Sequence, residues 1–152
     1  MNLQITEQKA KRIFPDAPEY IKEILLETFG KECFMKKEFT DIKTFEDACE
    51  VINERFVIIS GESYDETAYR KLKIIAKAIN NGWIPNWNDT NQRKWFPYFN
   101  LSSGFGFSFS FCVYVSADTG VGSRLCFETE EKATYAGTQF LELYRDFLTI
   151  TK

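Results

Sequence analysis

The segment GFGFSFSFCVYV, residues 104–115, carries the clearest structural signal in the chain. Large apolar side chains alternate with small or polar ones, which is the period of two expected of a β-strand. The apolar set is Phe105, Phe107, Phe109, Phe111, Val113 and Val115. Such alternation is typical of an antiparallel sheet with one face on the core and the other in water. We therefore expect one wholly apolar face on this strand, covered by the rest of the protein.

Neighbouring segments extend this strand into a small sheet. Residues 116–122, SADTGVG, are rich in turn-forming residues, and SRLCF at 123–127 predicts a short return strand. Residues 94–100, KWFPYFN, are a candidate third strand. Its proline, Pro97, favours an edge or a bulge, because proline donates no ladder hydrogen bond. The prediction is a small antiparallel β-meander of about three strands.

Helical patterns lie on both sides of this sheet. They cover residues 15–30, begin again within 43–52, and span 63–82. A C-terminal helix is predicted over residues 129–148, and its buried side gathers Ala133, Ala136, Gly137, Phe140, Tyr144 and Phe147. The glycine in this set costs a helix about 1 kcal/mol, which indicates that the backbone there packs closely on another element. The fold class is therefore α+β, with N-terminal helices and a C-terminal helix packed on the sheet.

The helix predicted over 63–82 has two different faces. At about 100° per residue, its apolar side gathers Ala68, Leu72, Ile75, Ala76 and Ile79. Arg70, Lys73 and Lys77 gather on the opposite side. Ile74 falls among these basic residues, where a core side chain is not expected. An apolar patch near Ile74 is therefore a candidate for contact with a partner.

The composition is that of an ordinary globular protein of 152 residues, with a net charge of −3. This length predicts a single domain, residues 1–152, in which residues 1–40 form a helical N-terminal extension with a less defined boundary. The sequence has neither the apolar region of a signal peptide nor a run long enough to cross a membrane. We therefore expect a cytoplasmic protein with no membrane partner.

The residue types needed for common catalytic and metal sites are missing or scattered. The chain has no histidine, which excludes a Ser–His or Cys–His pair within it. Its four cysteines, Cys33, Cys49, Cys112 and Cys126, form no CxxC pair and predict buried, reduced thiols. The stretch DTGVGSR, residues 118–124, favours a hairpin turn over an anion site at Arg124. We therefore predict no catalytic residues, no metal and no cofactor.

A second unusual stretch, WIPNWNDTNQRKWFPYF at residues 83–99, contains every tryptophan in the chain. Residues 70–96 also hold six basic side chains and one acid, Asp89, in a protein that is acidic overall. Basic groups beside stacking aromatics can bind single-stranded nucleic acid, and the same groups suit a sugar ring or a proline-rich peptide. The candidate ligand-binding residues are Trp83, Trp87, Trp95, Arg93 and Lys94, with Arg70, Lys73 and Lys77 beside them.

We favour a structural interpretation of the same stretch over a binding surface. The basic residues then form a solvated helix face, and the tryptophans cover the edge of the sheet. The amide side chains of Asn86, Asn88, Asn91 and Gln92 can orient a polar ligand, but they also build turns through local hydrogen bonds. We favour turn-building for these four residues.

Three segments resemble an uncharacterised protein family of gut Bacteroidetes and their phages and mobile elements. They are KLKIIAKAINNGWIPNWNDTNQRKWFPYF, then SGFGFS, then VGSRLCFETEEKATYAGTQFLELYRDFL. The resemblance covers about residues 40–148, and GSRLCF followed by YAGTQF is its most specific part. The family has no assigned activity, so the resemblance implies no site residues. It implies an intracellular accessory protein encoded by a phage or prophage.

These observations favour a non-enzymatic protein, a protein–protein interaction or structural module whose partner is another protein or itself. The alternative is single-stranded nucleic-acid binding through the basic, tryptophan-rich region at residues 70–99.

Overall fold

A computed structural model of the chain describes residues 5–34, 38–101, 106–118 and 122–149. The chain divides into two compact units, residues 1–37 and residues 38–152, and each is considered by itself. The prediction of a single domain stays a prediction. Of the helices in the described ranges, none is long and apolar enough to cross a membrane.

The smaller unit consists of short helices held together by aromatic contacts. Its elements are α1 (Glu7–Ile13), α2 (Glu19–Phe29) and a 3₁₀ helix η1 (Lys31–Phe34). The Phe34 ring stacks on Phe14 with 4.1 Å between ring centroids and meets Phe29 edge-on at 6.4 Å. Gly30 ends α2 with a φ of +80°, a backbone conformation that favours glycine.

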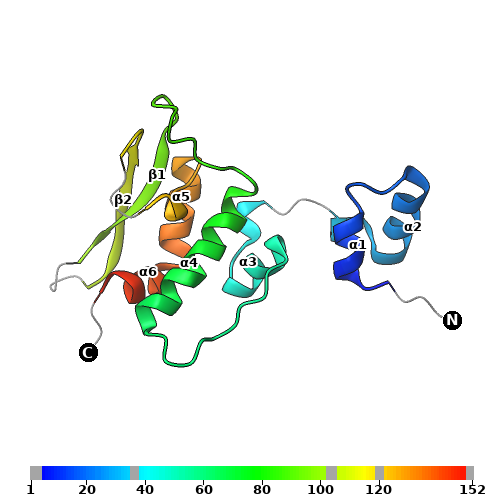
Figure 1. The fold of residues 1–152 in the computed structure, drawn as a ribbon, viewed down its shortest axis with the longest axis horizontal. Helices are drawn as coiled ribbons and strands as arrows, with labels where there is room; N and C mark the ends of the chain where they lie inside the picture. Colours follow the sequence, from blue (N-terminus) through cyan, green and yellow to red (C-terminus); the bar gives the residue numbers. More distant parts are fainter. Residues whose placement is uncertain (1–4, 35–37, 102–105, 119–121, 150–152) are drawn as a thin grey trace. The chain divides into compact units, whose positions relative to one another are not determined.

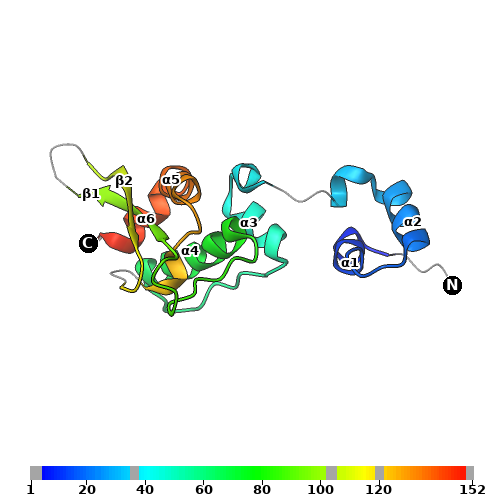
Figure 2. The same cartoon turned by 90° about the horizontal axis from the view of Figure 1, so that it is seen from above.

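The larger unit is α+β, as the sequence predicts. Its elements are η2 (Phe39–Asp41), α3 (Phe45–Ile52), α4 (Tyr64–Asn80), β1 (Lys94–Asn100), β2 (Ser108–Val115), η3 (Ser123–Leu125), α5 (Glu130–Gln139) and α6 (Leu141–Leu148). Figures 1 and 2 both place α4 and α5 between the sheet and α3. Helix α5 packs on both strands, while α6 and α3 pack on α4.

Helix α4 is the centre of this unit, and its two faces are those predicted. The five residues assigned to the apolar side, Ala68, Leu72, Ile75, Ala76 and Ile79, are all buried. Ser63 caps the helix in a reciprocal hydrogen-bond pair with Glu66, and Asn81 ends it with a positive φ. Ile74 is half-buried and packs partly against the core despite its basic neighbours.

Within the described ranges the sheet has two strands, and not the predicted three or so. Strands β1 and β2 pair antiparallel, with Pro97 opposite Cys112. The predicted return strand at 123–127 contributes one isolated bridge, in which Phe127 exchanges backbone hydrogen bonds of 2.9 and 2.8 Å with Trp95. Pairing stops there because η3 occupies residues up to Leu125 and the cap of α5 begins at Thr129. Residues 119–121 of the predicted turn lie outside the described ranges.

The alternation along β2 is interrupted by a β-bulge. Tyr98 pairs with Phe111, but the next residue, Phe99, pairs with Phe109, so Ser110 is an extra residue on β2. Because successive side chains alternate between the two faces of a strand, one inserted residue moves every side chain beyond it to the opposite face. The prediction of a single apolar face is therefore wrong, and the sequence could not reveal it because Phe and Ser continue to alternate through the bulge.

The phenylalanines of β2 consequently lie on opposite sides of the sheet. Phe107 and Phe109 contact Phe99, and the Phe99 ring lies 4.7 Å from that of Tyr144, so this group joins the core. Phe111 instead stacks on Tyr98, and these two side chains are 52% and 53% exposed. Phe105, which was assigned to the same apolar face, lies outside the described ranges.

The close packing expected at Gly137 is present. A Cβ atom placed on Gly137 would lie 2.7 Å from Cδ2 of Phe109 and 2.7 Å from Cβ of Pro97, so α5 crosses the sheet where only glycine fits. The C-terminal helix is two helices rather than one. It breaks at Phe140, where φ is −110° and ψ is 32°, and α6 turns onto α4 (Figure 1).

Candidate functional site

The last residue of α4, Asn80, brings together segments that are distant in sequence. Its side chain is almost fully buried, and Nδ2 donates to the Cys126 carbonyl at 2.8 Å. Its Oδ1 accepts from the Glu128 N–H at 3.1 Å, and its carbonyl accepts from the Trp83 N–H at 3.0 Å. Asn80 thus holds Trp83 and the start of α5 side by side.

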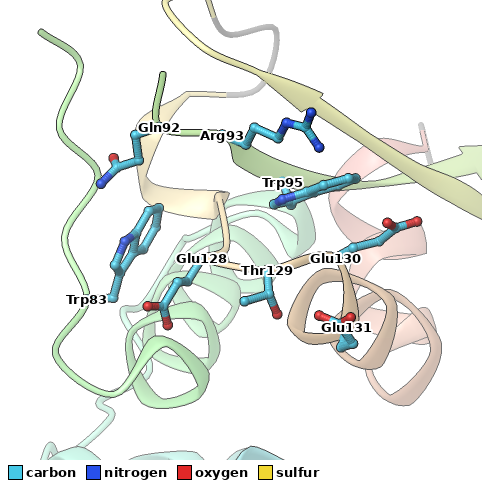
Figure 3. Close-up of a pocket in the computed structure, with 8 residues that line it drawn as sticks. All are labelled: Trp83, Gln92, Arg93, Trp95, Glu128, Thr129, Glu130 and Glu131. Carbon is cyan, nitrogen blue, oxygen red and sulfur yellow. The ribbon is translucent and has the colours of Figure 1, made fainter. Parts of the chain in front are cut away.

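An open hollow of about 520 Å³ lies between these segments, and we refer to it as the tryptophan hollow. Figure 3 shows Trp83 and Trp95 on opposite sides of it, with Glu128 and Thr129 between them. Both tryptophans are half-buried. The remaining lining residues are Gln92, Arg93, Glu130 and Glu131.

The β1 side of the tryptophan hollow is a stack of a cation and aromatic rings. The Arg93 guanidinium carbon lies 4.5 Å from the Tyr114 ring centroid, and the Tyr114 and Trp95 ring centroids are 5.1 Å apart. Cation–π attraction of this kind fixes the position of an otherwise exposed guanidinium. Arg93 therefore forms part of the wall of the tryptophan hollow.

Carboxylates from the start of α5 supply most of the charge in the tryptophan hollow. Glu128 pairs with Lys132 one helical turn later. Hydrogen bonds from its own backbone N–H and from the Thr129 hydroxyl hold the pKa of the Glu131 carboxyl below its usual range. Glu130 is exposed, and no cation pairs with it in the part of the chain that the structure describes. The hollow therefore combines aromatic walls with carboxylates that attract a cation.

Two of the predicted site residues, Trp87 and Lys94, lie away from the tryptophan hollow and contact each other. The Lys94 side chain is 0% exposed, and its Nζ donates to the Asp89 carbonyl at 2.9 Å and to the Ser116 carbonyl at 2.7 Å. Nζ also lies 5.2 Å from the Trp87 ring centroid. Lys94 thus ties the loop before β1 to the end of β2, and its buried position keeps it out of reach of a ligand.

The other three predicted residues, Arg70, Lys73 and Lys77, line a second hollow of about 370 Å³ along α4, which we call the basic hollow. Arg70 pairs with Glu62 at 2.6 Å and donates to the Val57 carbonyl at 2.9 Å. Lys77 pairs with Glu54. The eight residues proposed from the sequence as one surface therefore occupy three separate places.

Side chains in the loop between α4 and β1 build turns, and those of Asn86 and Gln92 do so as favoured from the sequence. Asn88 and Asn91 take part through their backbone N–H groups instead. The Asn86 N–H donates to Oε1 of Gln92 at 2.7 Å, and the Asn88 N–H donates to Oδ1 of Asn86 at 3.0 Å. The Asn91 N–H donates to Oδ1 of Asp89 at 2.9 Å. These bonds shape the loop that carries Gln92 into the tryptophan hollow.

None of the four cysteines forms a disulfide in the part of the chain that the structure describes, and of the thiols predicted to be buried only Cys126 is fully buried. Burial raises the pKa of the Cys126 thiol to about 11, so it stays neutral near pH 7. Cys33, Cys49 and Cys112 are half-buried, and burial raises the pKa of each of these thiols as well. None of the four has the lowered pKa of a reactive thiolate.

The sequence analysis missed the contribution of the segment before and into α5. Residues 129–131 were assigned to the start of the C-terminal helix, and Asn80 was one of the residues of the helix predicted over 63–82. The long-range hydrogen bonds of Asn80 place the segment at 126–128 beside Trp83. No local pattern signals such a contact.

Comparisons with family models, with curated proteins and with solved structures gave no match to this chain. The resemblance to a family from gut Bacteroidetes and their phages therefore stays a prediction.

Proposed function

We propose that this chain is a protein-interaction module without catalytic activity, which binds an extended segment of a partner protein in the tryptophan hollow. The proposed setting is the cytoplasm, as an accessory protein of a phage or mobile element, in keeping with the resemblance of residues 40–148. The observation that carries the proposal is the combination of two half-buried indole rings with carboxylates around one open hollow.

The lining chemistry indicates what the partner segment contains. Indole faces hold proline and aliphatic side chains, as in known modules that bind proline-rich segments, and they also attract cations. Glu130 supplies an unpaired carboxylate at the rim, which favours a lysine or arginine. The ligand class is therefore an extended, proline-containing segment that carries a basic residue.

Charge supports this ligand over single-stranded nucleic acid at the same place. The tryptophan hollow is lined by three carboxylates and one guanidinium, that of Arg93. Phosphates near it would meet a net negative charge, whereas nucleic-acid binding draws its affinity from clustered cations. Of the other cations that suggested nucleic acid, Lys94 lies inside the fold, and Arg70, Lys73 and Lys77 lie along α4.

The pKa of one carboxyl group in the tryptophan hollow supports attraction of a cation. Hydrogen bonds lower the pKa of the Glu131 carboxyl, so this group stays ionised near neutral pH. A general acid near neutral pH would instead need a raised pKa.

A peptide titration followed by tryptophan fluorescence tests the proposal. The probe is the peptide acetyl-APPRPPKPA-amide at 150 mM salt. We expect saturable binding that Trp83→Ala weakens by about 2 kcal/mol, a factor of about 30 in Kd, since aromatic anchors dominate such interfaces. Glu130→Lys should weaken binding about tenfold, because it replaces attraction by repulsion.

The matched control is Glu46→Lys, which reverses the charge of another exposed first-turn carboxylate. Glu46 lies in α3, outside the tryptophan hollow. This control variant should leave the affinity unchanged. Equal binding by the wild type and Trp83→Ala would contradict the proposal, as would tighter binding of oligothymidylate than of the peptide. Concentration-dependent mass in ultracentrifugation would instead identify a second copy of the chain as the partner.

A further inference from the structure

The basic hollow differs from the tryptophan hollow in charge and lies on different elements. Four cations, Arg55, Arg70, Lys73 and Lys77, line it together with a single acid, Glu54. Arg70 and Lys77 already have carboxylate partners. In the part of the chain that the structure describes, no carboxylate pairs with Arg55 or Lys73.

The two unpaired cations differ in exposure. Arg55 is exposed in the segment that follows α3, and Lys73 is half-buried. The Lys73 ammonium lies 4.8 Å from the Tyr69 ring centroid, which holds it at the helix surface without neutralising its charge. The basic hollow therefore presents a net positive charge in a protein whose net charge is −3.

An exposed aliphatic strip continues directly from the basic hollow. It consists of Val57, Ile58 and Ile59, three successive apolar residues that follow Phe56 of the hollow. All three are more than half exposed, and Ile58 is 79% exposed. The hydrogen bond from Arg70 to the Val57 carbonyl holds the strip beside α4. Contiguous exposed apolar side chains of this kind mark interaction surfaces.

The backbone of this segment is also suited to a partner. Residues 54–59 have no regular secondary structure. The residues of the strip are β-branched, and their exposed, extended side chains can pack against those of a second extended segment.

We propose that the basic hollow and the aliphatic strip together bind an acidic segment of another protein. Carboxylates of that segment pair with Arg55 and Lys73, and its apolar side chains cover Val57, Ile58 and Ile59. This site is separate from the tryptophan hollow, so the inference goes beyond the proposed function and does not depend on it.

The surroundings favour an acidic protein segment over nucleic acid. Binding of single strands relies on exposed aromatic rings for base stacking. The aromatic ring of the basic hollow, Phe56, is half-buried and is covered by the Arg70 guanidinium at 4.6 Å. The neighbouring exposed side chains are aliphatic, and they pack on apolar side chains rather than on bases.

The test measures anisotropy of the labelled peptide acetyl-DDLDEIDDL-amide with the full chain in 150 mM salt. We expect saturable binding. The double variant Arg55→Glu/Lys73→Glu should weaken it at least about tenfold, because two attractions become repulsions. Ile58→Ser should weaken it about fivefold through loss of apolar contact.

Both kinds of variant have matched controls. Ile84→Ser changes an isoleucine that is 81% exposed but lies outside the basic hollow. The double variant Lys43→Glu/Arg124→Glu reverses the charges of two exposed side chains elsewhere on the unit. Both controls should bind the acidic peptide as the wild type does. A peptide in which serine replaces leucine and isoleucine should bind about fivefold more weakly.

Three outcomes would overturn the proposal. One is an absence of binding by the acidic peptide at millimolar concentration. Another is an equal affinity for the wild type and the double variant. The third is binding of oligothymidylate or of phosphatidylserine vesicles, but not of the peptide, which would assign the surface to nucleic acid or to an anionic membrane.

Discussion

The tryptophan hollow and the basic hollow lie on the same compact unit but are built in different ways. The basic hollow takes most of its charge from one face of α4, with neighbours one helical turn apart. The tryptophan hollow draws on the loop after α4, on β1 and on the start of α5. The first depends on the period of a helix, whereas the second depends on tertiary contacts. Changes that loosen tertiary packing should therefore damage the tryptophan hollow first.

The largest effect is expected where α5, the helix whose first turn lines the tryptophan hollow, crosses the sheet. Gly137→Val would place side-chain atoms within 2.7 Å of Phe109 and Pro97, so the helix and the sheet must separate. We expect a loss of about 3 kcal/mol in the free energy of unfolding, at the upper end for overpacking. Urea unfolding followed by circular dichroism measures it. Thr138→Val, at the exposed next position, should change stability little, and a Gly137→Val protein as stable as the wild type would refute the close contact.

The next effect separates the two hollows directly. Asn80→Ala leaves the Cys126 carbonyl and the Glu128 N–H without their partner, which should cost about 2 kcal/mol of stability. The tryptophan hollow should bind its basic peptide more weakly, while the basic hollow keeps the acidic peptide. Fluorescence and anisotropy titrations of the same variant check both. Equal losses at the two hollows would mean that Asn80 supports the whole unit rather than one site.

A smaller effect distinguishes two adjacent cations that the sequence treats alike. Lys94→Ala removes the bonds to the Asp89 and Ser116 carbonyls and should cost about 1–2 kcal/mol of stability. Arg93→Ala changes an exposed residue and should stay within about 0.5 kcal/mol of the wild type. Thermal unfolding of the two variants in parallel gives the comparison. A larger loss of stability in Arg93→Ala than in Lys94→Ala would contradict the assignment of Lys94 as the buried cation and Arg93 as the exposed one.

The smallest effect concerns the start of α4, which carries the basic hollow. The Glu66 carboxylate accepts hydrogen bonds from the Ser63 N–H at 2.8 Å and from its hydroxyl at 2.9 Å, and these bonds lower its pKa. Because its pKa is lower in the folded state, this carboxyl group stabilises the protein at pH values above about 4.3, the pKa of a glutamate in the unfolded chain. This stability is lost as the pH falls from that value through the folded pKa.

Glu66→Gln should therefore flatten the dependence of stability on pH below about 4.3. Urea unfolding between pH 3 and pH 7 measures the slope, and Asp65→Asn, a neighbouring first-turn carboxylate outside the capping pair, is the matched control. If the slope of stability against pH is unchanged in Glu66→Gln, the Ser63–Glu66 capping pair does not contribute to the pH dependence of stability.

The sequence predicts those parts of the fold that depend on local periodicity. The caps at Ser63 and Asn81, the buried side of α4 and the close contact at Gly137 all follow from residue spacing or residue type. The α+β class follows as well, because a period of two and a period of 3.6 occupy separate segments.

The missed features arise from single residues with long-range consequences. Ser110 enters β2 as a bulge and turns Phe111 away from the core, although the alternation of letters is unbroken. Phe140 divides the C-terminal helix by adopting a non-helical backbone. Lys94 looks like a surface cation, but its position in β1 directs it into the protein, where its ammonium donates hydrogen bonds to backbone carbonyls. The secondary-structure propensities of the residues cannot predict the bulge, the helix break or the buried lysine, because tertiary contacts determine all three.

The central claim is that two hollows of opposite charge act as separate protein-binding sites. The most direct test is the ¹⁵N–¹H spectrum of the full chain, titrated in turn with the basic, proline-containing peptide and with the acidic peptide. The account predicts that the basic peptide shifts the indole signals of Trp83 and Trp95 and the amides of residues 128–131. The acidic peptide should shift the amides of residues 54–59 and 70–77 instead. Shifts of the same set of signals by both peptides, or of neither set, would contradict the claim.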